Sequence, residues 1–201
     1  MVKVAIFDYG AGNIFSLKNS LEKSGASVGV ITNFESSADY SGILLPGVGN
    51  FDPAIKSIRN SKTNFEDYIG DKIPVLGICL GMEMFFERSE EGNEKGLGVI
   101  DGEIIILPDS MKVPHMGWND LEIRRPSILL EGVKDRSWVY FVHSYRAKPG
   151  DDGVIVADSD YGVRVPAVIE RGNFFGTQFH PEKSGKTGAL MIKNFLRECK
   201  K

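Results

Sequence analysis

The chain has 201 residues, of which 42% are apolar and 25% are charged, the balance of an ordinary globular protein. This length suffices for one full core, so we expect a single domain over residues 1–201. The formal net charge of −3 and the lack of a Lys/Arg cluster argue against a nucleic-acid partner.

We expect neither a targeting segment nor a membrane-spanning segment from the sequence. Its start, Met-Val-Lys-Val-Ala-Ile-Phe-Asp, lacks the long apolar run and small-residue cleavage site of a signal peptide. No apolar stretch approaches the ~18 residues that a spanning helix needs. We therefore expect a cytoplasmic protein with no membrane partner.

The first half of the chain alternates strand and helix patterns. Short β-rich apolar runs predict buried strands at Val2–Phe7, Val28–Ile31, Ile43–Leu45 and Pro74–Ile78. A Gly-Ala-Gly-Asn turn at 10–13 leads into a predicted helix that stops near Gly25. Further helices are expected from Pro53 through Ile58 and over Met82–Glu87. This alternation predicts a mostly parallel open sheet flanked by helices.

From about Gly98 the pattern becomes β-rich, with short Gly, Asp and Pro turns. Strands are expected at Val99–Leu107, Asp120–Arg124, Trp138–Arg146, Val154–Ala157 and Ala167–Phe179, before a last helix over Lys186–Glu198. The predicted fold class is therefore α/β, a mostly parallel open sheet with an antiparallel β extension.

The two cysteines lie in different surroundings. Cys199 belongs to an apolar run at helical spacing, which predicts inert packing. Cys79 lies in Pro74-Val-Leu-Gly-Ile-Cys-Leu-Gly81, a strand, a Gly-x-Cys-x-Gly turn and a helix, which is the nucleophile-elbow pattern with cysteine in place of serine. We expect the helix N-terminus to favour the reactive thiolate. The alternative is a tight turn around an inert cysteine.

A cysteine nucleophile needs a base, usually a histidine that a third group orients. His180 lies in Gly-Thr-Gln-Phe-His-Pro-Glu-Lys, where Pro181 keeps it extended and Glu182 can accept a hydrogen bond from the imidazole. His115 and His143 remain possible bases, but neither has a carboxylate two residues away.

A glycine-rich loop follows the strand Ile43–Leu45. Gly47 and Gly49 permit positive φ angles, so the Val48 amide can turn toward a substrate. Together with the Leu80 amide it would form a two-donor oxyanion hole. A simple glycine-rich turn is the alternative interpretation.

These three segments, Pro-Gly-Val-Gly, Gly-Ile-Cys-Leu-Gly-Met and His-Pro-Glu, resemble the class I (triad) glutamine amidotransferases in order and spacing. The resemblance is nearest to the glutaminase subunits of imidazole glycerol phosphate synthases, through Asp8–Asn13, Pro114–Asn119, Tyr140–Arg146 and Phe179–Ser184. It covers essentially the whole chain, and Pro-His-Met-Gly-Trp-Asn is its most specific segment. The fold it implies is the flavodoxin-like one of these amidotransferases.

The resemblance implies hydrolysis of glutamine and transfer of the ammonia to a cyclase subunit with a (β/α)8 barrel, as a heterodimer. The cyclase would form imidazole glycerol phosphate and an aminoimidazole carboxamide ribotide in histidine biosynthesis. The resemblance also implies a set of residues at the subunit interface, namely Asn13, Trp118, Asn119, Tyr140 and Lys183. A core tryptophan is the alternative for Trp118.

The resemblance further places Glu91, His143, Ser144 and Tyr145 beside the bound glutamine. Glu83 departs from the family pattern, because glutamine usually stands four residues after the cysteine. A carboxylate can accept from the α-ammonium of glutamine but would repel its α-carboxylate.

We expect neither a metal nor an organic cofactor, since no Cys/His/Asp cluster has ligand spacing. Two other functions stay open, an amidotransferase for anthranilate, pyridoxal phosphate or guanylate synthesis and a non-catalytic α/β binding module. The segment Pro114–Asn119 argues against the first, and the intact Cys79, His180 and Glu182 argue against the second.

Overall fold

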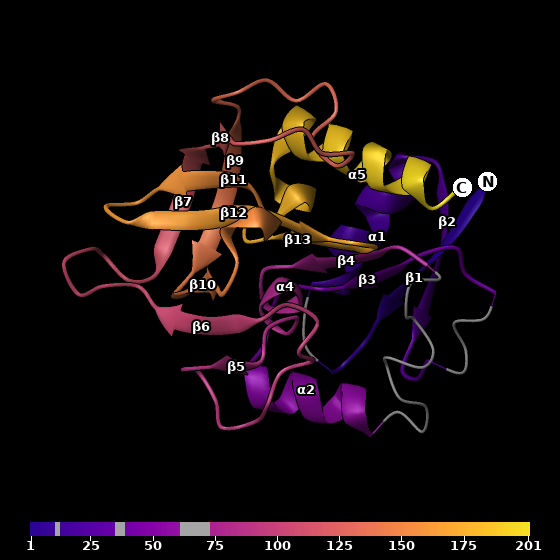
Figure 1. Cartoon of the computed structure of the whole chain (residues 1–201). Helices are drawn as coiled ribbons and strands as arrows, with labels where there is room; N and C mark the ends of the chain where they lie inside the picture. The colour runs from indigo at the N-terminus through magenta and orange to yellow at the C-terminus, as the bar shows by residue number, and fades with distance from the viewer. Residues whose placement is uncertain (11–12, 35–38, 61–72) are drawn as a thin grey trace.

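The computed structural model describes residues 1–10, 13–34, 39–60 and 73–201. Its largest element is an 8-stranded sheet with the strand order β2-β1-β3-β4-β13-β12-β11-β8 (Figure 1). The strands are β1 (Val2–Phe7), β2 (Ala26–Ile31), β3 (Ile43–Leu45), β4 (Val75–Ile78), β8 (Glu122–Ile123), β11 (Ile155–Asp160), β12 (Arg164–Arg171) and β13 (Phe174–Thr177).

One half of this sheet is parallel and the other half is antiparallel. The neighbours from β2 through β1, β3 and β4 to β13 all pair in parallel. The remaining pairs, β13 with β12, β12 with β11 and β11 with β8, are antiparallel. The predicted fold class, a mostly parallel sheet with an antiparallel extension, is therefore confirmed.

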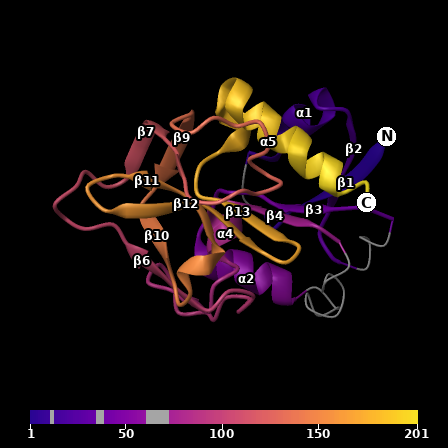
Figure 2. The same cartoon turned by 45° about the horizontal axis from the view of Figure 1, so that its top comes forward.

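Helices cover both faces of the parallel half (Figures 1 and 2). Helices α1 (Ile14–Lys23) and α5 (Gly185–Glu198) lie on one face, and α2 (Phe51–Arg59) lies on the other. Successive side chains of a strand point to opposite faces, so β1 divides its apolar residues between two cores. Val2, Val4 and Ile6 pack in the cluster of α1 and α5, whereas Ala5 and Phe7 pack in the cluster of α2.

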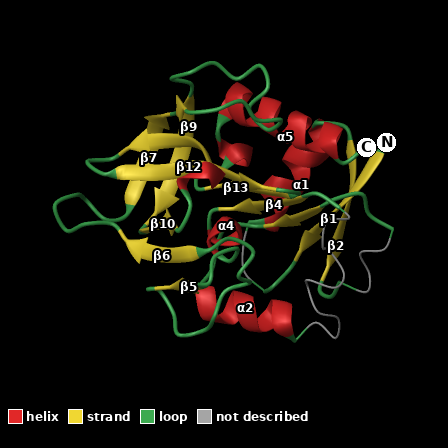
Figure 3. Cartoon of the chain, in the orientation of Figure 1, coloured by secondary structure: helices red, strands yellow, loops and turns green. Residues whose placement is uncertain are grey.

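The other strands form two smaller sheets at the antiparallel end of the molecule (Figure 3). One contains β5 (Arg88–Ser89), β6 (Gly102–Ile106) and β10 (Tyr145–Pro149). The other is an antiparallel ribbon of β7 (His115–Asp120) and β9 (Trp138–His143). Short helical turns complete the fold, namely α4 (Leu80–Glu83), η2 (Asp152–Val154) and η3 (Pro181–Lys183).

Several predicted elements differ from the structure. The helix expected over Met82–Glu87 is wrong, because α4 spans Leu80–Glu83 and the chain then turns toward β5. The strand predicted over Ala167–Phe179 is a hairpin, since Gly172 with φ of 56° separates β12 from β13. The strand predicted over Trp138–Arg146 divides at Ser144 into β9 and β10, which belong to different sheets.

The other boundaries differ less. The predicted strand Val99–Leu107 shortens to β6, and Asp120–Arg124 spans the end of β7 and all of β8. Of the predicted turn at 10–13, residues 11 and 12 lie outside the described residues. Within the described part of the chain, no helix is long and apolar enough to cross a membrane.

Candidate active site

The turn after β4 holds Cys79 in an unusual backbone conformation. Cys79 has φ of 48° and ψ of −108°, which is a strained conformation for a residue with a side chain. The two flanking glycines leave no room for larger residues. A Cβ at Gly77 would lie 2.6 Å from backbone atoms of Gly81 and Met82, and a Cβ at Gly81 would lie 2.8 Å from the carbonyl carbon of Leu45. The backbone geometry is that of the predicted elbow.

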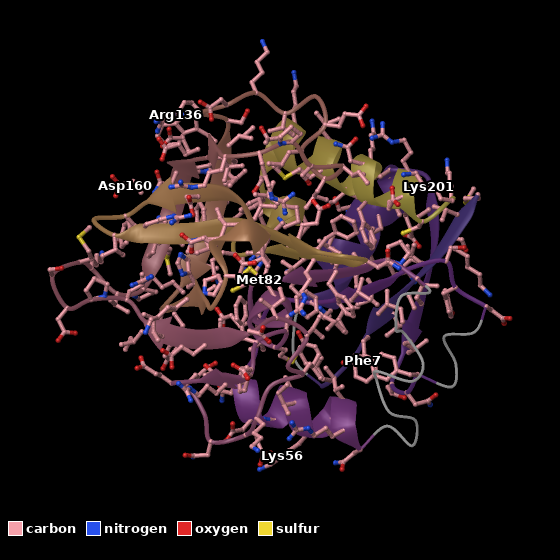
Figure 4. All side chains as sticks on the ribbon, viewed as in Figure 1. Phe7, Lys56, Met82, Arg136, Asp160 and Lys201 are labelled. Atoms are coloured by element: carbon pink, nitrogen blue, oxygen red, sulfur yellow. The ribbon has the colours of Figure 1, made fainter. Side chains whose placement is uncertain are left out.

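Strand pairing brings Cys79 and His180 to the same edge of the sheet. Strands β4 and β13 are parallel neighbours with Ile78 opposite Thr177, and the Cys79 amide donates to the Thr177 carbonyl at 2.6 Å. His180 follows β13 by three residues. Because the carboxyl ends of parallel strands meet at one edge, both residues lie at that edge. Helix α4, which follows Cys79, lies near the centre of Figure 1, and Figure 4 labels its Met82 there.

The imidazole of His180 is held by Glu182. The distance from Nδ1 of His180 to Oε1 of Glu182 is 2.9 Å, and the two side chains are 1% and 6% exposed. A carboxylate can only accept, so Nδ1 carries the proton and Nε2 is the basic nitrogen. Nε2 of His180 is buried without a hydrogen-bond partner among the described residues. The backbone is also fixed, since Ser184 Oγ donates to the His180 carbonyl at 2.6 Å.

A cavity of about 320 Å³ opens at Cys79. The cysteine sulfur lies 3.7 Å from the carbonyl oxygen of Val142 and 3.7 Å from Nε2 of Gln178. The lining residues come from the loop after β3, the elbow with α4, the segments after β5 and before β7, and the junction of β9 with β10. They are Gly47, Val48, Gly49, Cys79, Leu80, Glu83, Glu91, Pro114, Val142, His143, Ser144 and Tyr145. A larger hollow of about 760 Å³ lies over residues 123–133 and contains none of the predicted site residues.

The Leu80 amide at the helix N-terminus favours the thiolate of Cys79, as expected, but the net shift of its pKa is upward. Burial raises the pKa of this thiol well above its usual value, and the nearby Glu83 raises it further. Hydrogen bonds from the Leu80 backbone and the Gln178 side chain act in the opposite direction, but they do not prevail. A four-residue helix supplies only a weak dipole, so desolvation dominates. Burial therefore favours the neutral thiol of Cys79.

The glycine-rich loop packs directly on the elbow. A Cβ at Gly47 would lie 2.5 Å from the Ile78 carbonyl and 3.0 Å from the Cys79 Cβ, so only glycine fits there. Gly49 has φ of 128°, in the region that favours glycine. The loop therefore lies beside Cys79 in the same cavity, where its Val48 amide and the Leu80 amide are candidate donors to an oxyanion.

Glu83 lines this cavity and is 4% exposed. Its Oε1 accepts a hydrogen bond from Nε2 of Gln178 at 2.9 Å. Burial raises the pKa of Glu83 to about 7, against the opposing effect of that hydrogen bond. Sequence analysis did not single out Gln178, although it lies two residues before His180 and contacts both Cys79 and Glu83.

The other residues predicted to bind glutamine also gather at the cavity. Glu91, whose pKa is raised by burial, lies there with His143, Ser144 and Tyr145. Nδ1 of His143 lies 2.7 Å from the Tyr145 carbonyl, which can only accept, so Nδ1 is a donor and Nε2 an acceptor. Nδ1 of His115 therefore donates to Nε2 of His143, at 2.9 Å. This buried pair leaves neither histidine in the role of the base.

The pair is kept neutral by its surroundings. Burial lowers the pKa of His143 to about 3 and that of His115 to about 4. His115 is stacked between Phe141 and Tyr161, with ring centroids 4.7 Å and 3.8 Å away. The pairing of β7 with β9 places His115 opposite His143, an arrangement that sequence alone did not predict.

The predicted interface residues are exposed or partly exposed. Trp118 is 51% exposed on β7 and packs edge-on against Tyr140 of β9, which excludes the alternative of a core tryptophan. Lys183 and Asn13 are exposed, and Asn13 caps α1 by accepting from the Ser16 amide at 3.1 Å. Asn119 is partly buried, and its Nδ2 donates to the Asp160 carbonyl at 2.8 Å.

Comparison with known proteins places this fold and site in a family. The family model for glutamine amidotransferase class-I matches residues 5–199. Two Thermotoga maritima structures resemble the fold. PurLQS has a TM-score of 0.75 and 19% identity, over 98% of both chains. A glutamine amidotransferase has a TM-score of 0.67 and 18% identity, over 92% of this chain and 78% of its own. The chain belongs to the class I glutamine amidotransferases.

Its relatives within the family are more specific. The chain is similar to the imidazole glycerol phosphate synthase subunit HisH of Methanocaldococcus jannaschii, at 44% identity over 96% of this chain and 98% of that one. The subunit of the same name from Geobacillus thermodenitrificans is 44% identical over 98% and 96% of the two chains. The one from Aquifex aeolicus is 41% identical over 100% and 99%.

Proposed function

We propose that the chain is the glutaminase subunit of imidazole glycerol phosphate synthase, which hydrolyses glutamine and delivers ammonia to a cyclase subunit. The observation that carries this proposal is the convergence of Cys79, His180 and Glu182 at one sheet edge, in a chain 44% identical to relatives named as that subunit. Histidine biosynthesis in the cytoplasm is the corresponding role. The expected partner is a (β/α)8 barrel.

In the proposed mechanism, Nε2 of His180 takes the proton of Cys79 as the sulfur attacks the side-chain amide of glutamine. The free, buried Nε2 and the proton held on Nδ1 by Glu182 suit this role. The amides of Val48 and Leu80 stabilise the tetrahedral oxyanion. His180 then protonates the leaving ammonia, and water cleaves the γ-glutamyl thioester with His180 again as the base.

Because the buried Cys79 favours the neutral thiol, its reaction depends on His180 to remove the proton. Because burial disfavours the thiolate, the sulfur becomes nucleophilic as its proton moves to the imidazole. Glu182 stabilises the imidazolium that results. This order of events protects the thiol from adventitious reaction while the site is empty.

An exposed apolar surface on the β7–β9 ribbon supports the proposed partner. Three large apolar side chains of the ribbon, Met116, Trp118 and Trp138, are 62%, 51% and 57% exposed. The ribbon also contacts the catalytic segment, since the His180 amide donates to the Tyr140 carbonyl of β9 at 3.0 Å. Large exposed apolar patches mark protein interaction sites. A cyclase docked here would cover the edge at which ammonia is released.

The test is the glutaminase rate of this chain alone and with a cyclase partner. Ammonia made without an acceptor is lost, so we expect a low rate for the isolated chain and a marked increase on addition of the cyclase and its ligand. The Trp118→Ala variant tests the docking surface: it should keep the basal rate of the isolated chain and lose the increase on addition of the cyclase. Equal rates with and without cyclase would contradict the proposed coupling.

A further inference from the structure

Glu83 is a buried carboxyl group that pairs with no cation among the residues that the structure describes. Its hydrogen bond from Gln178 is a neutral one, and Glu91, another carboxyl group, raises the pKa of Glu83. An ionised carboxylate in such a place is costly unless a cation or several donors compensate it. The cavity that Glu83 lines therefore favours the neutral acid.

The geometry leaves one oxygen of Glu83 for a proton. Oε1 accepts from Gln178 Nε2, and the same Nε2 lies 3.7 Å from the Cys79 sulfur. Protonation of Oε2 would make the side chain an acceptor at one end and a donor at the other, as in a glutamine amide. Glu83 is also tied to the nucleophile through the backbone, since its amide donates to the Cys79 carbonyl at 3.0 Å.

We propose that Glu83 acts as a neutral carboxylic acid during glutamine hydrolysis, and that its ionisation turns the site off. The inference rests on the proposed glutaminase function and adds a pH-dependent residue to it. Two effects follow from ionisation. A negative charge on Glu83 opposes formation of the Cys79 thiolate. It also repels the α-carboxylate of glutamine. A charge on Glu83 is not needed for the α-ammonium group, because Glu91 in the same cavity can accept its hydrogen bonds.

The titratable groups around Glu83 do not offset its charge. Cys79 lies on the preceding turn, Tyr9 follows β1, Glu91 follows β5 and Tyr145 begins β10, and each interacts electrostatically with Glu83. The hydroxyl of Tyr9 is buried without a partner in the described part of the chain, and burial raises the pKa of Tyr9 well above its usual value. None of these four groups is a cation at neutral pH.

The experiment compares wild type, Glu83→Gln and Glu22→Gln as complexes with the cyclase. Glu22→Gln removes the same charge from an exposed position on α1 and serves as the matched control. The first readout is kcat/KM for glutamine from pH 6 to pH 8. With a pKa of about 7, ionisation of Glu83 should make the ratio of Glu83→Gln to wild type rise about tenfold over this range.

The second readout is the rate of Cys79 alkylation by iodoacetamide in the isolated chain without glutamine. We expect the Glu83→Gln thiol to react faster than wild type at pH 8, with a much smaller difference at pH 6. A flat ratio in either assay, or loss of activity in Glu83→Gln at every pH, would overturn the inference. A rising alkylation ratio in a chain that hydrolyses no glutamine would support the inference about Glu83 and refute the glutaminase proposal.

Discussion

Replacing Gly81 by alanine is the most direct perturbation of the elbow. Gly81 lies in α4 and packs against Leu45 of β3. A Cβ at this position would overlap the backbone carbonyl oxygen of Leu45, and it would lie 2.8 Å from the carbonyl carbon and 3.0 Å from the Leu45 Cβ. Ordinary contacts begin near 3.4 Å, so β3 or α4 must move.

The cost follows from what would have to move. Leu45 is fully buried and pairs with Gly77 in the β3–β4 ladder, so backbone displacement there strains two strands and the core above α2. Overpacking of this kind costs about 1–3 kcal/mol, and the upper end applies because backbone atoms cannot rotate away. We expect Gly81→Ala to lower the free energy of unfolding by about 3 kcal/mol.

Urea unfolding followed by circular dichroism measures this change, with Gly150→Ala as the control. A Cβ at Gly150 would meet its nearest atoms at 3.5–3.7 Å, which is ordinary contact. We expect Gly150→Ala to lie within about 0.5 kcal/mol of wild type. Equal stabilities of the two variants would refute the packing argument for the elbow.

Two further predictions concern the histidines. Glu182→Gln should reduce the glutaminase rate by about 10²–10⁴-fold with little change in the urea midpoint, because the amide no longer stabilises the His180 imidazolium; a variant with wild-type turnover would contradict this role. The free energy of unfolding should fall as the pH falls from about 6.5 to about 4. In this range the histidines of the unfolded chain bind protons, whereas buried His115 and His143, with pKa values of about 4 and about 3, stay neutral in the folded state. His115→Asn should make that dependence shallower by up to ~1.4 kcal/mol per pH unit in urea titrations, and an unchanged slope would contradict the account.

The parallel half of the fold could be predicted because its strands are buried on both faces. Runs such as Val75–Ile78 and Ile43–Leu45 contain no polar side chain, which separates them clearly from the amphipathic helices. The elbow and the His180–Glu182 pair could also be predicted, because both are local motifs. Each depends on residues within a few positions of one another in the sequence.

Strand β7 escaped prediction because its apolar residues face outward. Met116 and Trp118 are exposed, whereas His115 is buried, so the usual alternation of a half-buried strand is inverted. Gly117, with φ of 140°, and the neighbouring Pro114 weaken the pattern further. When a partner protein covers the outer face of a strand, apolar residues occupy that face. The sequence of one chain does not show which face a partner would cover.

The electrostatics of the site depend on tertiary contacts and could not be predicted. Local sequence suggested a thiolate at Cys79, but its pKa is set by burial and by Glu83 and Gln178, the latter 99 residues away in sequence. The His115–His143 pair likewise exists only because β7 and β9 are in register. Motifs therefore located the chemistry, while the protonation states required the folded structure.

In the proposed function, Cys79 releases ammonia from glutamine for a cyclase. The most direct measurement is formation of imidazole glycerol phosphate by the complex from the phosphoribulosyl aminoimidazole-carboxamide substrate, with either glutamine or an ammonium salt as the nitrogen source. Wild type and Cys199→Ala should use both sources, because Cys199 caps the C-terminus of α5 and does not line the cavity. Cys79→Ala should use ammonium alone. Product formation from glutamine by Cys79→Ala at the wild-type rate would contradict the account.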